Sequence, residues 1–254
     1  MSHSASYQSV IFIDLDGTLM VNPFETAVWP EVLGEIARTS GESIASVYTL
    51  IEAENDARQQ DSNVPPVLAM DWDDISMTVA RRRGVELEAN CADLVRQHAA
   101  SHSSTLEYAH EALQELQAPE RALVVATKGL ATYQQPVLDA LGLTPYLTAV
   151  LTPDSHNGLK KHLRFFGAWP ERGRLAIMVG DRYDDDVLYP ARHGFKTIWK
   201  PPQSLIPASL HAQDPFTRAQ LYPYIQEQPL PATAIILSLR ELPETVTKLE
   251  QIFA

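Results

Sequence analysis

The sequence of 254 residues contains one cysteine, Cys91, and this scarcity excludes an internal disulfide framework and metal sites built from several thiolates. Cys91 stands in a stretch whose apolar residues follow helical spacing, so we expect it to be buried in a helix. Long apolar runs are also lacking, since no stretch is long enough to span a bilayer. Residues 1–8 are polar and lack the apolar core of a secretory signal. We therefore expect a cytoplasmic protein without a membrane partner.

Basic residues are in the minority, with 20 lysines and arginines against 32 aspartates and glutamates. The formal net charge of -12 and the pI of about 5.0 argue against broad binding to nucleic acids, which requires a basic surface. A small anionic substrate is still compatible with this charge, because a few local cations or a metal ion can reverse the field at one site.

The most informative stretch is an apolar run over residues 10–15 that two carboxylates interrupt. Asp14 lies inside the run, and Asp16 follows Leu15 directly, with Gly17 and Thr18 after it. Continuous apolar runs of this length are typical of parallel strands that are covered on both faces. Two acids thus stand where a buried strand reaches solvent, which is the edge where open α/β sheets bind their ligands.

Further strand patterns alternate with helical patterns in the second half of the chain. The predicted strands cover residues 122–126, 147–151, 175–179, 195–199 and 233–238. This alternation predicts an α/β fold with a doubly wound parallel sheet. Asn157 is expected to cap a further helix. The seven prolines of residues 200–231 predict an extended surface excursion, whose role the sequence does not disclose.

Residues 21–103 show helical patterns and no convincing strand. Pro30 suits the first turn of a helix, and Ser43 and Asp71 suit N-caps, because their side chains can accept from free backbone amides. These signals predict a helical cap at residues 21–103, inserted into a core formed by residues 1–20 and 104–254.

Polar residues follow three of the predicted strands. They are the Asp14-to-Thr18 segment, Thr127-Lys128-Gly129, and Gly180-Asp181 with three further aspartates at positions 184–186. A lysine pair, Lys160 and Lys161, lies between the second and third groups. Because the carboxyl ends of parallel strands meet at one edge, we expect carboxylates, a hydroxyl and an ammonium to converge there. This set provides oxygen ligands for a divalent metal and donors for a phosphate group.

These motifs resemble those of the haloacid dehalogenase-like (HAD) hydrolase superfamily, and the resemblance covers the sheet domain up to about Trp199. It implies a Rossmann-like core and, for the insert, a cap of the all-helical type. It also implies site residues: Asp14 as nucleophile, Asp16 as general acid and base, Thr127 and either Lys160 or Lys161 as phosphate ligands, and Asp14, the Asp16 backbone carbonyl, Asp181 and Asp186 as ligands of magnesium. Asp185 is left open between a place in that site and a solvated acidic turn.

The resemblance implies a magnesium-dependent phosphatase that hydrolyses a small soluble phosphomonoester through an aspartyl-phosphate intermediate. Its expected partner is therefore a small phosphorylated metabolite. Three alternatives stay open: a phosphomutase of the same family, a haloacid dehalogenase, and a non-catalytic binding or regulatory protein on the same scaffold. The dehalogenases lack the second carboxylate of the first motif, so Asp16 argues against that alternative. Neither the substrate nor the oligomeric state follows from the sequence.

Overall fold

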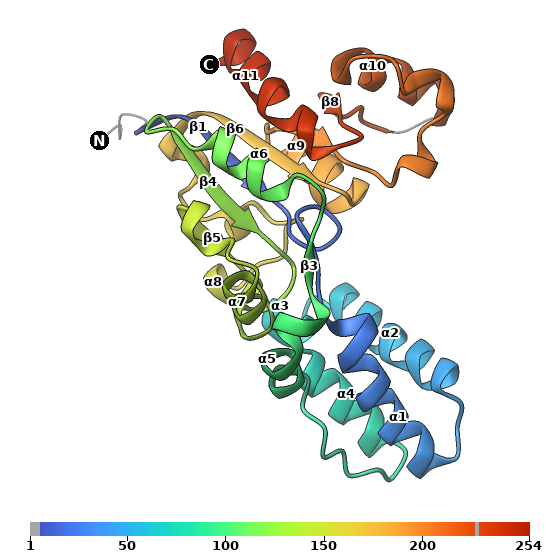
Figure 1. Ribbon diagram of the computed structural model, residues 1–254. Helices are drawn as coiled ribbons and strands as arrows, with labels where there is room; N and C mark the ends of the chain where they lie inside the picture. The colour runs from blue at the N-terminus through green and yellow to red at the C-terminus, as the bar shows by residue number, and fades with distance from the viewer. Residues whose placement is uncertain (1–5, 227–228) are drawn as a thin grey trace.

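The computed structural model describes residues 6–226 and 229–254, and its centre is a sheet of six parallel strands. The strands are β1 (Tyr7–Ile13), β4 (Arg121–Ala126), β5 (Ala149–Leu151), β6 (Gly173–Gly180), β7 (Lys196–Trp199) and β8 (Ala234–Ile235). Their order is β5-β4-β1-β6-β7-β8, so the winding reverses at β1, between β4 and β6 (Figure 1). The predicted doubly wound α/β fold is confirmed.

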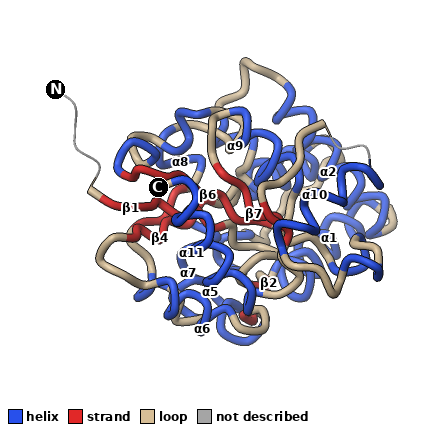
Figure 2. Tube along the Cα trace, turned by 90° about the horizontal axis from the view of Figure 1, so that it is seen from above, coloured by secondary structure: helices blue, strands red, loops and turns tan. Residues whose placement is uncertain are grey.

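Helices cover both faces of the sheet. The helices of the core are α6 (Ala109–Leu116), α7 (Ala131–Ala140), α8 (Pro153–His156), α9 (Tyr189–Arg192), α10 (Pro215–Gln226) and α11 (Leu242–Phe253). The sheet separates α6, α7 and α11 from α8 and α9 (Figure 2). Along β1, Ile11 and Ile13 belong to one apolar cluster, and Val10 and Phe12 to another on the opposite face. This two-sided burial explains why the strand reads as an unbroken apolar run.

The first half of the chain forms a separate group of helices, which we call the cap. Its helices are α1 (Trp29–Ser40), α2 (Ile44–Gln60), α3 (Pro66–Ala69), α4 (Trp72–Arg81) and α5 (Cys91–His102), preceded by the π-helical turn η1 (Phe24–Val28). The cap lies below the sheet in Figure 1, and the short antiparallel pair β2 (Met20–Val21) and β3 (Ser104–Thr105) joins it to the core. This pair lies at the two predicted ends of the cap, residues 21 and 103. The division of the chain into two domains stays a prediction. None of the described helices is long and apolar enough to cross a membrane.

The local signals in the cap act as predicted. Ser43 and Asp71 accept hydrogen bonds from backbone amides at the first turns of α2 and α4, and Pro30 lies in the first turn of α1. The two side chains satisfy amides that have no partner within their helices, and proline has no such amide to satisfy. Cys91 is buried at the start of α5, as its spacing predicts.

Two predictions of local structure are wrong. The proline-rich segment is packed and partly helical, because three of its prolines stand at helix starts, where no amide is lost. They are Pro202 before η6 (Gln203–Leu205), Pro207 before η7 (Ala208–Leu210) and Pro215 at the start of α10. Leu210 and Tyr222 are buried in one apolar cluster with Trp199. Residues 227–228 of this segment lie outside the described residues. Asn157, instead of starting a helix, ends α8 in the left-handed conformation, and only a 3-10 turn, η3 (Leu163–Phe166), follows. The remaining 3-10 turns are η2 (Thr144–Tyr146), η4 (Pro170–Arg172) and η8 (Leu239–Glu241).

A buried ion pair ties the last helix to the sheet. Glu250 of α11 accepts hydrogen bonds from Arg121 (2.6 and 2.9 Å) on β4 and from the Ser9 hydroxyl (2.6 Å) on β1. We expect Glu250→Ala to lower the free energy of unfolding by roughly 3 kcal/mol, because it leaves the guanidinium without its buried partner. Glu244→Ala is the control, since Glu244 lies on the same helix but is exposed, and it should cost less than about 1 kcal/mol. Urea unfolding measures both, and equal losses would contradict the anchoring role.

Candidate active site

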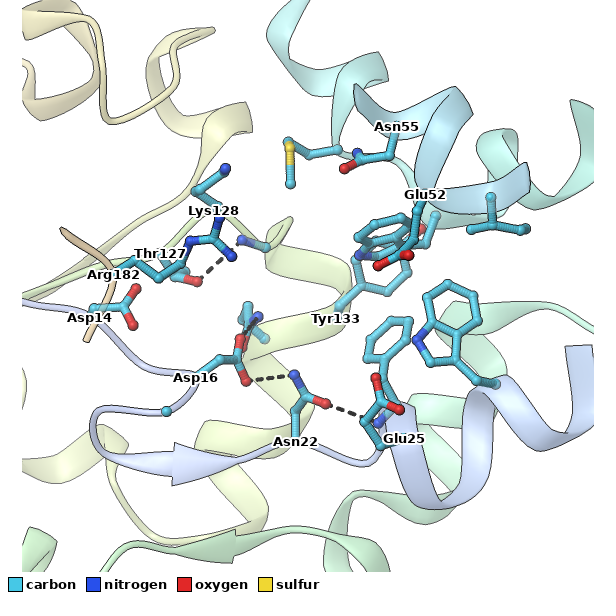
Figure 3. A pocket seen from close by; sticks show the side chains of 18 of the residues that line it. Asp14, Asp16, Asn22, Glu25, Glu52, Asn55, Thr127, Lys128, Tyr133 and Arg182 are labelled. Carbon is cyan, nitrogen blue, oxygen red and sulfur yellow. Dashed lines mark hydrogen bonds between the residues drawn. The ribbon is translucent and has the colours of Figure 1, made fainter. Parts of the chain in front are cut away.

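The predicted polar residues do converge at the carboxyl edge of the sheet. Asp14 follows β1, Thr127 follows β4 and Asp181 follows β6, and these three strands are direct neighbours. Asp14 and Thr127 are buried, although both contribute to the wall of a cavity between the sheet and the cap (Figure 3). The polar side chains thus gather at the carboxyl ends of the strands where the winding reverses, as expected for a ligand site in an open α/β sheet.

Three carboxylates form a compact acidic cluster. Asp14, Asp181 and Asp186 each offer an oxygen atom, and these atoms lie within 4.8 Å of one another. Burial and the charge of Asp14 raise the pKa of Asp181 to about 6, and its Oδ1 atom is buried with no hydrogen-bond partner in the described part of the chain. Crowded oxygen ligands with an unused acceptor are what a hard divalent cation prefers, so these residues fit magnesium.

Two glycines allow this cluster to be so tight. A Cβ atom at Gly180 would overlap the carboxylate of Asp186, and one at Gly17 would overlap that of Asp181. Gly17 also has a φ of 79°, which favours glycine. The glycines of the first and last motifs are therefore steric requirements of the acidic cluster as well as turn residues.

A buried lysine compensates the acidic cluster. Lys160 is almost fully buried and donates hydrogen bonds to Oδ1 of Asp14 and to Oδ1 of Asp186 (2.8 Å). Burial disfavours its ammonium, but the charges of the two carboxylates outweigh this cost and raise the pKa of Lys160. Lys161 instead donates to the Gln59 carbonyl of the cap (2.9 Å), so the structure brings Lys160 and not Lys161 into the cluster.

Asp16 has a different environment from Asp14. Its Oδ1 accepts a hydrogen bond from the Asn22 amide (2.6 Å), and its Oδ2 accepts one from the Gln134 amide (2.8 Å). Burial and the charge of Asp14 raise the pKa of Asp16 to about 6, against the effect of these two donors. Its carboxylate lies outside the acidic cluster. An acid with such a pKa can both donate and accept a proton near neutral pH.

Asn22 and Gln134 are site residues that the sequence patterns do not predict. Asn22 stands at the start of the cap, where its own Oδ1 accepts from the Phe24 amide (2.9 Å), and Gln134 lies in α7. A Cβ atom at Gly129 would overlap the Gln134 amide, so this glycine makes room for the bond to Asp16. Gly129, next to Thr127 and Lys128, is the sequence signal that a side chain approaches the backbone closely at this point.

The remaining predicted residues surround this centre. Thr127 accepts a hydrogen bond from the Gly129 amide (3.1 Å), and within residues 6–226 and 229–254 its own proton has no acceptor. Asp185, the residue left open, forms ion pairs with Lys128 and Arg182 (both 3.2 Å), and the charge of Lys128 overcomes the effect of burial and lowers its pKa. Asp185 thus lies beside the acidic cluster and holds two cations near it.

A cavity of about 690 Å³ extends from these groups to the cap. Asp14, Asp16, Thr127 and Lys160 line its core side, and residues of η1, α2 and α4 line the opposite side. This volume suits a small organic molecule.

Comparison with known proteins agrees with this geometry. A protein-family model described as haloacid dehalogenase-like hydrolase matches residues 8–194. The chain belongs to this family of hydrolases. Its fold is similar to that of a HAD phosphatase from Thermococcus onnurineus (20% identity, TM-score 0.67, covering 94% of this chain and 97% of that one).

Two further proteins of similar fold are a putative hydrolase and a dehalogenase. One is the putative HAD-hydrolase YfnB from Bacillus subtilis bound to magnesium (15% identity, TM-score 0.60, covering 94% and 98%). The other is the L-2-haloacid dehalogenase from Xanthobacter autotrophicus (15% identity, TM-score 0.59, covering 95% and 99%). Identities this low establish a common fold only. A comparison with curated proteins finds no match.

We expect magnesium to stabilise this HAD-like hydrolase. At about 100 times its dissociation constant, an ion that binds only the folded state adds roughly 2.7 kcal/mol and raises Tm by roughly 5–10 °C. Asp181→Asn should abolish this increase, because it removes a carboxylate of the acidic cluster. Asp184→Asn, the same change at an exposed aspartate of the same loop, should preserve it. A full increase in Asp181→Asn, measured by calorimetry, would exclude the acidic cluster as the binding site.

Proposed function

We propose that this hydrolase is a magnesium-dependent phosphatase that hydrolyses a small phosphomonoester through an aspartyl-phosphate on Asp14. The observation that carries the proposal is the second carboxylate, Asp16. Two neutral amides hold it at the cavity, and its raised pKa of about 6 suits proton transfer. A phosphate ester requires a group that protonates the departing alcohol oxygen, and Asp16 meets this requirement.

In this proposal Asp14 attacks phosphorus while the ester bond breaks. Lys160 and the Thr18 hydroxyl, which donates to Oδ2 of Asp14 (3.3 Å), orient the attacking carboxylate. Asp16 gives its proton to the alcohol oxygen and then takes a proton from the water that attacks the intermediate. That water releases inorganic phosphate and restores both aspartates. The free proton of Thr127 is available to a phosphate oxygen.

Asp14, Asp181 and Asp186, together with the Asp16 backbone carbonyl that the family resemblance implies, would hold the magnesium ion. When bound, the ion supplies positive charge that reduces the repulsion between the carboxylate and the phosphate. The buried ammonium of Lys160 contributes charge of the same sign to this end of the cavity. Phosphoryl transfer depends mainly on positioning and charge of this kind.

The similar haloacid dehalogenases keep dehalogenation as the second candidate. Asp16 and its two amide donors argue against it, since a halide leaving group needs no proton. A phosphomutase would return the phosphoryl group to an organic molecule, and a binding protein would not transfer it at all. Identifying the reaction products therefore distinguishes both from a phosphatase.

We expect magnesium-dependent release of inorganic phosphate from a panel of phosphorylated metabolites and from 4-nitrophenyl phosphate. Asp14→Asn should lower the rate at least 1000-fold, because the nucleophile is lost. Asp16→Asn should be slow on alkyl esters and should retain aspartyl-phosphate that acid quenching traps. Asp184→Asn serves as the control for a lost charge. Activity that survives in Asp14→Asn, or that needs no divalent ion, would refute the proposal.

A second prediction concerns pH. Asp16 must be protonated to act as an acid, so kcat/KM for an alkyl phosphate should fall as the pH rises above about 6. Gln134→Leu removes a donor that favours the carboxylate form, so the pKa of Asp16 should rise and the falling limb should move to higher pH. Gln135→Leu, a neighbouring change whose amide bonds Asp139 instead, should leave the limb in place. An unchanged profile in Gln134→Leu would separate this limb from Asp16.

A further inference from the structure

The two ends of the cavity differ in the charges that line them. At the core end, three cations, Lys128, Lys160 and Arg182, line the cavity together with Asp14 and Asp16. At the cap end, three are acids: Glu25, Glu52 and Asp56. Among the described residues that line the cavity, the cap contributes no lysine or arginine. In Figure 3, Glu25 and Glu52 lie across the cavity from Asp14 and Asp16.

Aromatic side chains lie beside these acids. Trp29 contacts Trp72 at 90° with ring centroids 5.3 Å apart, and it contacts Tyr48 at 78° and 6.3 Å. All three rings line the cavity, and Tyr48 and Trp72 are partly exposed there. Burial raises the pKa of the Tyr48 hydroxyl, and the charges of Glu25 and Glu52 raise it further, so both carboxylates lie near this hydroxyl.

Aromatic faces bordered by carboxylates attract organic cations. The negative face of an indole or phenol ring binds an ammonium group, and a nearby carboxylate adds a direct charge interaction. The same surroundings repel a second phosphate or a carboxylate. The proposed function places the phosphate at the core end, where Lys128, Lys160 and Arg182 provide positive charge beside Asp14 and Asp16. A ligand that satisfies both ends is anionic at one end and cationic at the other.

We propose that the cap end of this cavity is a subsite for an ammonium group, so that the substrate is a phosphomonoester of an amino alcohol or of a quaternary ammonium alcohol. This rests on the proposed function, because it assigns the phosphate to the core end. Tyr48 and Trp72 provide faces for the ammonium, and Glu52 and Glu25 provide the countercharge.

The test compares phosphocholine with 3,3-dimethylbutyl phosphate, its neutral isostere in which carbon replaces nitrogen. We expect wild-type kcat/KM to favour phosphocholine by roughly tenfold or more. Glu52→Gln should lower the ratio of the two kcat/KM values by roughly tenfold. Because wild type and variant act on the same two esters, any difference in the acidity of the two alcohols cancels in this comparison. Glu86→Gln, the same change at an exposed cap residue that does not line the cavity, should leave the ratio within about twofold.

The aromatic contribution has its own pair of variants. Tyr48→Phe keeps the ring face and should keep most of the preference, whereas Tyr48→Leu removes the face and should lower it. Both tyrosine variants, Glu52→Gln and wild type are also assayed on 4-nitrophenyl phosphate with magnesium, which has no ammonium group. Turnover of this ester without any preference for phosphocholine, or an unchanged preference in Glu52→Gln, would overturn the ammonium subsite and leave the phosphatase proposal intact. No turnover of any ester would overturn the phosphatase proposal itself.

Discussion

The contact of Lys160 with Asp14 and Asp186 is the interaction on which the rest of the site depends. Three carboxylates crowded beyond the ends of β1 and β6 repel one another, and burial adds to the cost of their charge. One ammonium that bonds two of them offsets part of this cost. Because Lys160 lies in a loop without regular structure, its position depends on η3, whose Phe165 and Phe166 pack against the sheet.

The backbone of the site is shaped by close approach rather than by secondary structure alone. Gly17, Gly129 and Gly180 each stand where a Cβ atom would overlap a functional side chain, respectively that of Asp181, Gln134 and Asp186. A packed interior cannot yield enough to admit an extra methyl group at such positions. The motifs of this family therefore contain glycines for two reasons, the turn at a strand end and the room that neighbouring side chains need.

The sequence predicted the parts of the structure that follow from local or periodic signals. The strands were predictable because parallel strands buried on both faces require continuous apolar runs, and Ser43 and Asp71 identified two helix starts through capping. Gln134 was not predictable, because its role follows from the packing of α7 against the loop after β1, and that is a tertiary contact. The sequence could not show which of Lys160 and Lys161 enters the site, for a similar reason. Both lie in an irregular loop, where no helical or strand periodicity fixes the direction of a side chain.

Asp14 and Asp16 are two residues apart, yet their partners differ in kind. Asp14 accepts a hydrogen bond from the ammonium of Lys160, which holds its carboxylate in place. Asp16 bonds two amides, which orient both of its oxygens without adding a full positive charge. Neutral donors of this kind favour the carboxylate less strongly than a lysine does, so burial can still raise the pKa of Asp16 to about 6. The roles proposed for the two aspartates match these partners: a cation bonds the proposed nucleophile, and two amides bond the acid that is proposed to exchange its proton.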